Sequence, residues 1–593
     1  MPAGHHPEMT QHSAVFTHQG EAMTQAEGFV YQWREPVAAP QAKGEGLGGA
    51  PATGDAGAPA PVYHHTVESG MIIERNVAVT MRDGITIFAD VFRPIDESPA
   101  PPIVAWGPYG KHQNGNLAAN PKTNVRPGMV SKYATFEGPD PLYWVPLGYA
   151  IVNADSRGMW YSEGDATFLS PEEARDYHDL IEWAGTQPWS NGKVGMSGVS
   201  YLSSSQWRVA ELQPPHLAAM NIWEGWTDTY REVVYHGGIP DTFFWSKLLA
   251  PAWGTSTTRI EDLVAEQRDH PLLDALWASK AADFSKIRVP AFIVACWADQ
   301  GLHLRGTLQG FKKIASEQKW LEIHGRKKWA YYYEPESKER LRQFFDHFLM
   351  GRHTPLEDWP RVRMEVREKY FVGEFRGESE WPLERTTYTR LYLNAQQGVL
   401  QEAQVAEEGT FSYSSLASGP GSHRAEFQYV FDRDTELVGH SKLTLFMSTD
   451  DSDDMDVFVG LYKFDAAGQF VPLAYYTFFE DGPVALGWLR ASHRELDEER
   501  STDFQPVHTH AREQKLAPGE VVPLEIEIWP SGTSFKAGER LRLIVQGTDL
   551  QKYSKIRDPV YTRHEETVNS GNHVIHAGGG YESFLLVPMI PGE

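Results

Sequence analysis

The chain has 593 residues, 41% of them hydrophobic and 22% charged, and this composition excludes a wholly disordered protein. Its length is well beyond that of a usual single domain, so we expect two or three domains with sizeable cores. The formal net charge of −25 argues against a nucleic acid as partner, because phosphate binding depends on clustered lysine and arginine side chains.

Cys296 is the only cysteine in the sequence, so no internal disulfide can form and an oxidising compartment is not implied. Residues 1–16 lack a basic region followed by an apolar stretch. No run in the chain approaches the roughly 18 apolar residues that cross a bilayer. We therefore expect a cytoplasmic protein that binds neither nucleic acid nor membranes, while a homo-oligomer remains open.

Residues 36–61 are rich in Pro, Gly and Ala and contain almost no large apolar side chains, a composition typical of a flexible chain. The sequence therefore predicts a flexible N-terminal extension over residues 1–65. Ordered structure is expected from residue 71 onward, where alternating apolar residues flank Asp83-Gly84, a hairpin turn signal.

The next part of the chain alternates buried strands with helices. Apolar runs near 101–107 and 149–155 each end in a glycine-containing loop. A helix follows, with Ser170 as N-cap and Glu173 completing a capping box. A strand–helix succession of this kind predicts a parallel sheet covered on both faces, with its chemistry at the carboxyl ends of the strands.

The stretch "GKVGMSGVSYLSSSQW", residues 192–207, contains five serines. A nucleophile elbow holds its serine on a sharp turn between strand and helix, among small neighbours. Ser200, two positions after Gly198, fits that turn, whereas Ser197 would lie inside the strand. Leu202 stands where the full pattern has a second glycine, so a Gly/Ser-rich turn without catalysis is the alternative on the motif alone.

Candidate partners for Ser200 follow two later strands. Asp299 ends the apolar run "AFIVACWAD", and His324 ends the run "KWLEIH". The order serine, acid, histidine is the one in which an α/β-hydrolase supplies its triad. The sequence therefore predicts the catalytic triad Ser200, Asp299 and His324.

The ordered segments "WGPYGKH", "DSRGMWYSEG", "WSNGKVGMSGVSYL", "FIVACWADQG" and "LEIHGRKKW" resemble the cocaine esterase and X-Pro dipeptidyl-peptidase-like group of serine hydrolases, over about residues 70–590. The resemblance assigns the nucleophile to Ser200 rather than Ser197. It also implies an oxyanion hole formed by the Tyr109 hydroxyl and the backbone N–H of Tyr201. Ser203 departs from the group, in which a glycine is common at this position. The implied mechanism needs no metal and no organic cofactor.

Residues 213–288 are helical in pattern and rich in aromatics, which predicts a cap inserted into the α/β domain. Trp223, Trp226 and Phe244 are candidate substrate-binding residues, although each serves equally well in the cap's own core.

Two cap carboxylates raise a separate question. If Glu224 or Asp228 faces the acyl pocket, it would bind a substrate ammonium group. Carboxylates exposed to solvent would have no role in binding substrate, and we favour this second interpretation.

From about residue 386 the apolar pattern changes to a period of two, separated by Gly, Pro and Asp turns. This predicts an all-β sandwich, which resembles the group's C-terminal jelly roll. The expected order is a flexible extension at 1–65, an α/β-hydrolase domain in two parts at 66–212 and 289–385, a helical cap at 213–288 and a jelly-roll domain at 386–593.

These features together predict a serine hydrolase that cleaves the carboxylic ester bond of a small-molecule substrate through an acyl-enzyme. An X-Pro dipeptidyl-peptidase or an amide-cleaving acylase is the alternative among enzymes. A binding protein with a vestigial hydrolase site is the alternative from another class.

Overall fold

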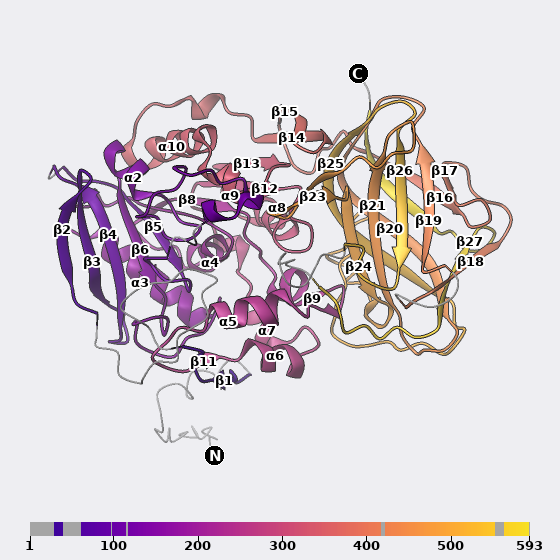
Figure 1. The fold of residues 1–593 in the computed structure, drawn as a ribbon, viewed down its shortest axis with the longest axis horizontal. Coiled ribbons are helices and arrows are strands. Elements are labelled where there is room, and N and C mark those ends of the chain that lie inside the picture. The colour runs from indigo at the N-terminus through magenta and orange to yellow at the C-terminus, as the bar shows by residue number, and fades with distance from the viewer. Residues whose placement is uncertain are drawn as a thin grey trace, which may run out of the picture.

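The computed structural model describes residues 29–38, 61–96, 98–113, 115, 117–416, 422–551 and 563–591, which form an α/β unit, a cap and a C-terminal β unit (Figure 1). Most of the Pro/Gly/Ala-rich run at 36–61 lies outside these residues. Among the helices of the described chain, none combines the length and the apolar character needed to cross a membrane.

The α/β unit is built on one large twisted sheet. Its described strands pair in the order β2-β3-β4-β6-β5-β7-β8-β12-β13-β14-β15, parallel from β6 to β14 and antiparallel at both edges. The strands are β2 (His64–Glu68), β3 (Met71–Thr80), β4 (Thr86–Pro94), β5 (Pro102–Gly107), β6 (Ala150–Asp155), β7 (Val194–Val199), β8 (Leu217–Trp223), β12 (Ala291–Cys296), β13 (Lys319–His324), β14 (Val362–Lys369) and β15 (Val372–Glu378).

The central strands β5, β6, β7 and β12 are buried along their whole length, as parallel strands covered on both faces must be. The predicted hairpin at Asp83-Gly84 is confirmed, since β3 and β4 pair in antiparallel register on either side of it. The helices of this unit are α2 (Pro141–Trp144), α3 (Pro171–Gly185), α4 (Tyr201–Ala210), α8 (Leu304–Lys313), α9 (Lys328–Tyr333) and α10 (Pro335–Met350), with short 3-10 turns η1 (Leu117–Ala119), η2 (Pro121–Thr123), η3 (Val145–Leu147) and η7 (Pro355–Asp358).

Helix α3 begins as predicted, because the Ser170 hydroxyl accepts a hydrogen bond from the Glu173 N–H at 3.0 Å. The Glu173 carboxylate does not close the expected capping box. It instead accepts from the Leu169 N–H, from Trp106 Nε1 at 2.8 Å and from the Tyr201 hydroxyl at 2.7 and 2.9 Å. Glu173 therefore connects the start of α3 to Tyr201, the first residue of α4.

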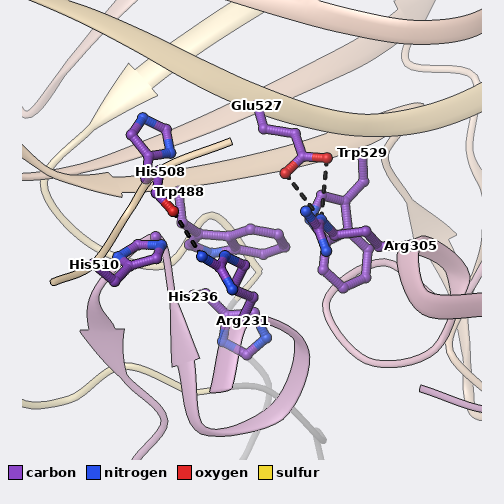
Figure 2. Close-up of a pocket in the computed structure, with 9 residues that line it drawn as sticks. Arg231, His236, Arg305, Trp488, His508, His510, Glu527 and Trp529 are labelled. Carbon is purple, nitrogen blue, oxygen red and sulfur yellow. Dashed lines mark hydrogen bonds and ion pairs between the residues drawn. The ribbon is translucent and has the colours of Figure 1, made fainter. Parts of the chain in front are cut away.

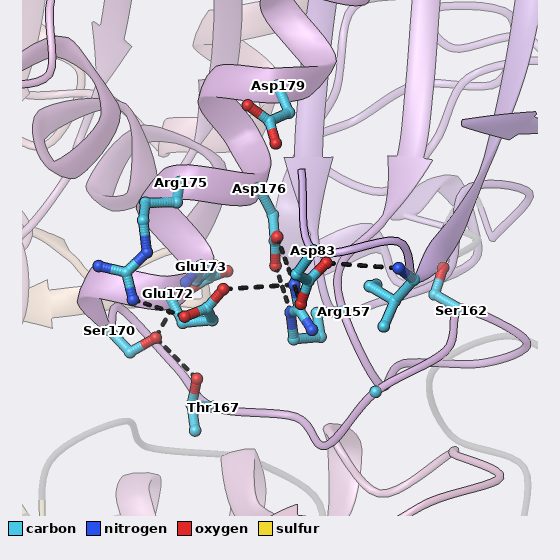
Figure 3. A network of polar contacts seen from close by, with 12 residues as sticks. Asp83, Arg157, Ser162, Thr167, Ser170, Glu172, Glu173, Arg175, Asp176 and Asp179 are labelled. Atoms are coloured by element: carbon cyan, nitrogen blue, oxygen red, sulfur yellow. Dashed lines mark hydrogen bonds and ion pairs between the residues drawn. The ribbon is translucent and has the colours of Figure 1, made fainter. Parts of the chain in front are cut away.

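The loop after β6 is held by a buried arginine (Figure 3). The Arg157 guanidinium pairs with Asp176 at 2.6 Å, with Asp83 at 2.8 Å and with Glu172 at 3.3 Å. Gly158 beside it has φ +68°, and a Cβ there would lie 2.4 Å from a backbone nitrogen. These contacts connect the β3–β4 turn to α3, so Arg157 is a structural residue.

The cap lies between β8 and β12. Its elements are η4 (Tyr230–Val234), β9 (Tyr235–His236), β10 (Ile239–Pro240), η5 (Phe244–Leu249), α5 (Ala250–Ala252), β11 (Ile260–Glu261), α6 (Leu263–Asp269), α7 (Ala275–Ser279) and η6 (Phe284–Lys286), where η4 and η5 have π-helical hydrogen bonding. The expected boundary at residue 213 is corrected, because Leu217–Trp223 forms strand β8 of the central sheet. The alternating pattern of this strand is hidden because all its side chains from residue 219 onward are buried.

The expectation that residues 1–65 are flexible throughout is also corrected. Strand β1 (Trp33–Arg34) pairs antiparallel with β11 of the cap. Phe29 and Tyr31 are buried, and their rings pack edge to face. Residues 29–38 are therefore an added part of the cap, which supplies the apolar surface that this short segment cannot bury alone.

The C-terminal β unit consists mainly of antiparallel strands around a second hydrophobic core of its own. One set pairs in the order β16-β28-β20-β25, with β27 and β18 extending it, and the other pairs as β24-β21-β26-β19. The strands are β16 (Thr387–Asn394), β17 (Val399–Gln401), β18 (Gly409–Ser414), β19 (Arg424–Val430), β20 (Thr435–Thr449), β21 (Asp456–Phe464), β22 (Leu473–Tyr475), β23 (Phe479–Gly482), β24 (Ala485–Arg490), β25 (Val522–Phe535), β26 (Arg540–Gln546), β27 (Asn572–Ala577) and β28 (Phe584–Ile590), with the turn η8 (Ala491–His493). The predicted change to an all-β texture is confirmed by these strands.

Candidate active site

Ser200 occupies a strained turn between β7 and α4. Its backbone has φ 62° and ψ −117°, a conformation that a non-glycine residue adopts only when its surroundings impose it. The surroundings are specific, because the Ser200 N–H donates to the Trp223 carbonyl and the Val199 N–H donates to the Glu137 carbonyl. The turn has the geometry of a nucleophile elbow, which presents a serine hydroxyl at the carboxyl end of a strand.

Close packing around the elbow leaves room only for small residues at two positions. A Cβ on Gly198 would lie 2.4 Å from the Leu202 Cβ, and a Cβ on Gly225 would lie 2.8 Å from the Ser203 Cβ. Ser203, the departure noted from the sequence, donates to the Gly198 carbonyl at 2.6 Å and accepts from the Trp223 N–H at 2.6 Å. Its hydroxyl thus ties the elbow to β8, and the helix start is intact.

Ser197 lies inside strand β7 and not on the elbow turn. Its hydroxyl donates to Asn221 Oδ1 at 2.9 Å and contacts the Tyr332 hydroxyl at 2.9 Å. The side chain is completely buried and does not line the pocket described below. Ser197 is a structural serine of the sheet.

The histidine beside Ser200 is His303. Its Nε2 lies 3.0 Å from the Ser200 Oγ, and its Nδ1 lies 2.5 Å from the Asp299 Oδ2. Asp299 follows β12, and His303 is the N-cap residue of α8, four positions later. The short turn between β12 and α8 therefore carries both the acid and the imidazole. The structure brings Ser200, His303 and Asp299 into a serine–histidine–aspartate arrangement.

The predicted place of His324 is corrected by this geometry. His324 ends β13, where it is paired in register with Cys296, three positions before Asp299. Its ring stacks on Tyr331 at 3.9 Å between centroids, its Nδ1 accepts from the Arg326 N–H, and its Nε2 lies 3.3 Å from Glu224 Oε1. The side chain is completely buried, and its two ring nitrogens lie next to Arg326 and Glu224.

A signal for His303 was present in the sequence as the spacing "DQGLH". A histidine four residues after an acid can reach it when the chain turns between them, as it does at residues 300–303. The expectation that acid and base come from separate strand ends concealed it.

Burial and neighbouring charges shift the titration of this pair. Burial lowers the pKa of His303 to about 4. The Lys328 ammonium also lowers this pKa, whereas the Asp299 carboxylate raises it. Burial alone would raise the pKa of Asp299, but the charges of His303 and Lys328 outweigh it and hold that pKa below its ordinary value. The resting state at neutral pH is therefore neutral His303 beside ionised Asp299, as a general base requires.

Lys328, at the start of α9, is a functional candidate that sequence reasoning missed. Its Nζ lies 3.7 Å from the Asp299 Oδ2 and 3.5 Å from the His303 Nδ1. The residue is nearly fully buried and also lines the pocket next to Ser200. The ammonium supplies the buried Asp299 with a counter-charge.

The pocket that reaches Ser200 has a volume of about 400 Å³. Its lining is largely apolar and comes from three parts of the molecule, as shown by Leu117 of the α/β unit, Leu248 of the cap and Phe478 of the C-terminal unit. A pocket of this kind suits an apolar acyl or alkyl group placed against the hydroxyl.

The predicted substrate-binding residues divide between pocket and core. Phe244 lines the pocket. Trp223 does not, since it belongs to β8 and packs against Tyr332 at 5.0 Å between ring centroids. Trp226 packs on the ring of His303 at 5.6 Å and also lies outside the lining. The two tryptophans are completely buried supports of the site.

The predicted oxyanion residues lie beside the nucleophile. Tyr109 lines the pocket together with Ser200, and its ring packs edge to face on Phe136 and Tyr201. The Tyr201 hydroxyl is bound to Glu173, so a role for this residue in the reaction depends on its backbone N–H at the first position of α4.

Neither cap carboxylate that raised the ammonium question lines the pocket. Asp228 pairs with Arg231 at 2.7 Å, and Glu224 is completely buried beneath the triad. The expectation of solvated carboxylates is therefore wrong for Glu224. The pocket contains a different carboxyl group, Glu137, whose Oε1 accepts from Trp329 Nε1 at 2.7 Å. Burial raises the pKa of Glu137 to about 7, against the opposing charge of Lys328.

The C-terminal unit holds the loop that carries the acid and the base. The Tyr476 N–H donates to the Ala298 carbonyl at 2.8 Å. The Gln300 amide donates to the Pro530 carbonyl at 3.1 Å and accepts from the Leu486 N–H at 3.1 Å. This unit thus contacts the residues on both sides of Asp299.

A charged cluster next to this loop also connects the C-terminal unit to α8 and to the cap (Figure 2). Arg305, two residues after His303, binds Glu527 at 2.9 Å and Glu232 of the cap at 2.9 Å. Arg231 donates to the His508 carbonyl at 2.7 Å. Strand β25, the cap and the first turn of α8 therefore meet in one cluster.

The comparisons with known proteins agree with this architecture. Residues 83–327 match the model of the X-Pro dipeptidyl-peptidase S15 family, and residues 355–586 match the model of the X-Pro dipeptidyl-peptidase C-terminal non-catalytic domain. Cocaine esterase from Rhodococcus sp. (strain MB1 Bresler) is 26% identical, over 88% of this chain and 100% of its own length.

Solved structures extend the comparison. A CocE/NonD family hydrolase from Staphylococcus aureus is 43% identical, with a TM-score of 0.85 over 89% of this chain and 96% of its own. An α-amino acid ester hydrolase shares the fold at 17% identity, with a TM-score of 0.64 over 89% of this chain and 98% of its own. The chain therefore belongs to the cocaine esterase and X-Pro dipeptidyl-peptidase-like family of serine hydrolases.

Proposed function

We propose that this hydrolase cleaves carboxylic esters through an acyl-enzyme formed on Ser200. The observation that carries the proposal is the short chain of contacts from Ser200 Oγ to His303 Nε2 at 3.0 Å and from His303 Nδ1 to Asp299 at 2.5 Å, next to an apolar pocket. Cocaine esterase and putative serine esterases of Mycobacterium among its relatives support an ester as substrate.

In the proposed reaction, His303 removes the Ser200 proton as the oxygen attacks the ester carbonyl. Asp299 holds the ring with Nε2 toward the serine and stabilises the imidazolium that forms. His303 then protonates the leaving alkoxide, and a water molecule activated by the same ring releases the acid. Tyr109 and the Tyr201 N–H are the proposed donors to the oxyanion, where losing one such donor costs about 3 kcal/mol in the barrier.

An X-Pro dipeptidyl-peptidase is the second candidate, and Glu137 is the observation in its favour. This carboxyl group lines the pocket, and its Oε2 has no hydrogen-bond partner among the described residues. A peptidase of this kind needs an acceptor for the ammonium group of its substrate. The apolar remainder of the lining favours the ester.

The C-terminal unit carries no part of the proposed chemistry except the pocket wall at Phe478. We infer that its two sets of strands form a jelly roll whose function is to complete the pocket and to fix the acid loop. Its antiparallel pairing and separate core support this assignment.

The test compares kcat/KM for a short-chain nitrophenyl ester and for a glycyl-prolyl nitroanilide, in the wild type, Ser200→Ala and Ser197→Ala. Ester turnover lost on the order of 10⁴-fold or more in Ser200→Ala, and largely kept in Ser197→Ala, is the expected result. Strong anilide cleavage would establish the peptidase instead. Equal labelling of wild type and Ser200→Ala by a serine-reactive phosphonate would contradict the assignment of the nucleophile.

A further inference from the structure

Four buried polar atoms beneath the triad have no hydrogen-bond partner among the described residues. They are the two Glu224 oxygens, Asp299 Oδ1 and His324 Nε2. Buried polar atoms without partners are rare, because each costs the loss of its bonds to water. Four of them in one cluster therefore require a physical explanation.

The three groups are close together. His324 Nε2 lies 3.3 Å from Glu224 Oε1. Carboxyl oxygens of Glu224 and Asp299 and a ring nitrogen of His303 all lie within 4.8 Å of one another. Glu224 follows β8 with φ 55°, and its N–H donates to the Val294 carbonyl of β12, so the backbone holds this side chain between the two histidines.

The proton on His324 is placed by its other nitrogen. His324 Nδ1 accepts from the Arg326 N–H at 3.1 Å, so in the neutral ring Nε2 carries the hydrogen. Burial and the Arg326 charge hold the pKa of His324 well below its ordinary value, which keeps the ring neutral. His324 therefore offers a donor to Glu224 and no positive charge.

We propose that Glu224 carries a proton and acts as a positioning residue that donates it, as a hydrogen bond, to Asp299 Oδ1, while His324 Nε2–H donates to Glu224. The Glu224 proton joins Glu224 to Asp299 and the His324 Nε2–H joins His324 to Glu224, so all four atoms have partners. The resulting chain runs from His324 through Glu224, Asp299 and His303 to Ser200. This chain would hold Asp299 in one orientation, since each of its oxygens has its own donor. This inference rests on the proposed role of His303.

The charges around Glu224 support the protonated form. A second carboxylate beside Asp299 would place two buried anions together, with the Lys328 ammonium as their nearby cation. Burial raises the pKa of Glu224 well above its ordinary value, the charges of Asp299 and Glu137 raise it further, and Lys328 opposes them. The Cys296 Sγ lies within 4.8 Å of a Glu224 carboxyl oxygen. Burial raises the pKa of this thiol and keeps it protonated.

The first experiment measures kcat/KM for the nitrophenyl ester against pH in Glu224→Ala and Glu224→Gln. Alanine removes the donor to Asp299, and we expect a loss of about 10- to 100-fold, the ratio that a lost hydrogen bond to a charged group produces. Glutamine has an amide N–H for Asp299 and a carbonyl for His324, so it should recover most of that loss. The acid limb of the profile should stay in place in the glutamine variant.

An ionised Glu224 predicts the opposite pH behaviour. Removing an anion near His303 would lower the pKa of that ring, so the acid limb of Glu224→Gln would move to lower pH. A shift of that sign would overturn the proposal. So would stoichiometric zinc or another divalent metal in the purified wild type that is lost in Glu224→Gln, because a metal on Glu224, Cys296 and His324 would take the place of the proton.

The second experiment does not depend on turnover. At pH 9 the infrared difference spectrum of wild type minus Glu224→Gln should contain the carbonyl band of a buried carboxylic acid, shifted in D₂O. Glu266→Gln is the matched control, since burial raises the pKa of Glu266 to about 10 at a distant site in the cap, and this variant should lose its own band and keep the wild-type pH profile.

Absence of the Glu224 band would overturn the protonated state. A band present without serine-dependent ester turnover would instead show that the proposed function, and not this inference, has failed.

Discussion

The elbow that presents Ser200 and the loop that presents Asp299 and His303 are held in different ways. The elbow depends on its own segment and the adjoining strand, through Gly198, Ser203 and the Trp223 backbone. The acid loop depends on bonds to residues from far along the chain, in the C-terminal unit. A catalytic site can therefore combine one half that is encoded locally with another that forms only when two domains meet.

The identity of the base is the sharpest test of this comparison. We expect His303→Ala to lower kcat/KM for the ester on the order of 10⁴-fold or more, because the serine loses its proton acceptor. His324→Gln, which keeps a donor toward Glu224, should cost less than about tenfold, the range of one hydrogen bond. Steady-state kinetics of both variants, with circular dichroism to confirm folding, decides between them. The reverse order of effects would restore His324 as the base.

The local half is probed by Gly198→Ala. The new methyl group would meet the Leu202 side chain at 2.4 Å, so the elbow must shift. We expect a kcat loss of about 100-fold and a destabilisation of about 1–3 kcal/mol from overpacking. Denaturant unfolding and kcat are the measurements.

Gly409→Ala in β18 is the control for that substitution. Its nearest atom is in the flexible Gln396 side chain, at 3.3 Å, so both quantities should stay near wild type. An unchanged kcat in Gly198→Ala would show that the turn tolerates movement.

The distant half is probed by Gln300→Leu, which removes the bonds to Pro530 and Leu486. The leucine leaves buried backbone groups unpaired, and we expect about a tenfold lower kcat with KM nearly unchanged. The matched control is Gln404→Leu, on an exposed part of the β unit. A loss confined to thermal stability would mean that the β unit supports the fold without positioning the acid.

The smallest expected effect is in the pH profile. Since the pKa of His303 lies near 4, ester turnover should be constant through neutral pH and fall only as the pH drops toward 4, when the ring is protonated and cannot accept the serine proton. Any additional inflection near pH 7 should disappear in Glu137→Gln, because that carboxyl titrates at about 7. An acid limb between pH 6 and 7 that survives in Glu137→Gln would contradict the lowered pKa of His303.

The comparison also explains which residues of the site were predictable. Ser200 was found because glycine spacing and a strand–helix junction are visible in a short window. Asp299 was found because it follows a strand of wholly apolar residues. His324 was a reasonable choice by the same rule, yet the register of β13 places it beside Cys296 and beneath the triad. No local pattern records that register.

The residues that line the pocket are likewise not predictable from local sequence patterns. Phe244, Leu117 and Phe478 are distant in the sequence and share no motif, yet all three line one pocket. Trp223 and Trp226 were attractive candidates by residue type, and only packing shows that they lie behind the site. Glu137 was missed because its position depends on the bond between its carbonyl and the Val199 N–H.

The sequence by itself determined the α/β and all-β character of the two halves, the elbow serine and the acid, because hydrophobic period and turn chemistry act over a few neighbouring residues. The tertiary structure decided the base, the pocket wall and the packing of residues 29–38 on the cap. Those outcomes depend on strand register and on contacts between domains, where free energy is gained by burying groups that are hundreds of positions apart.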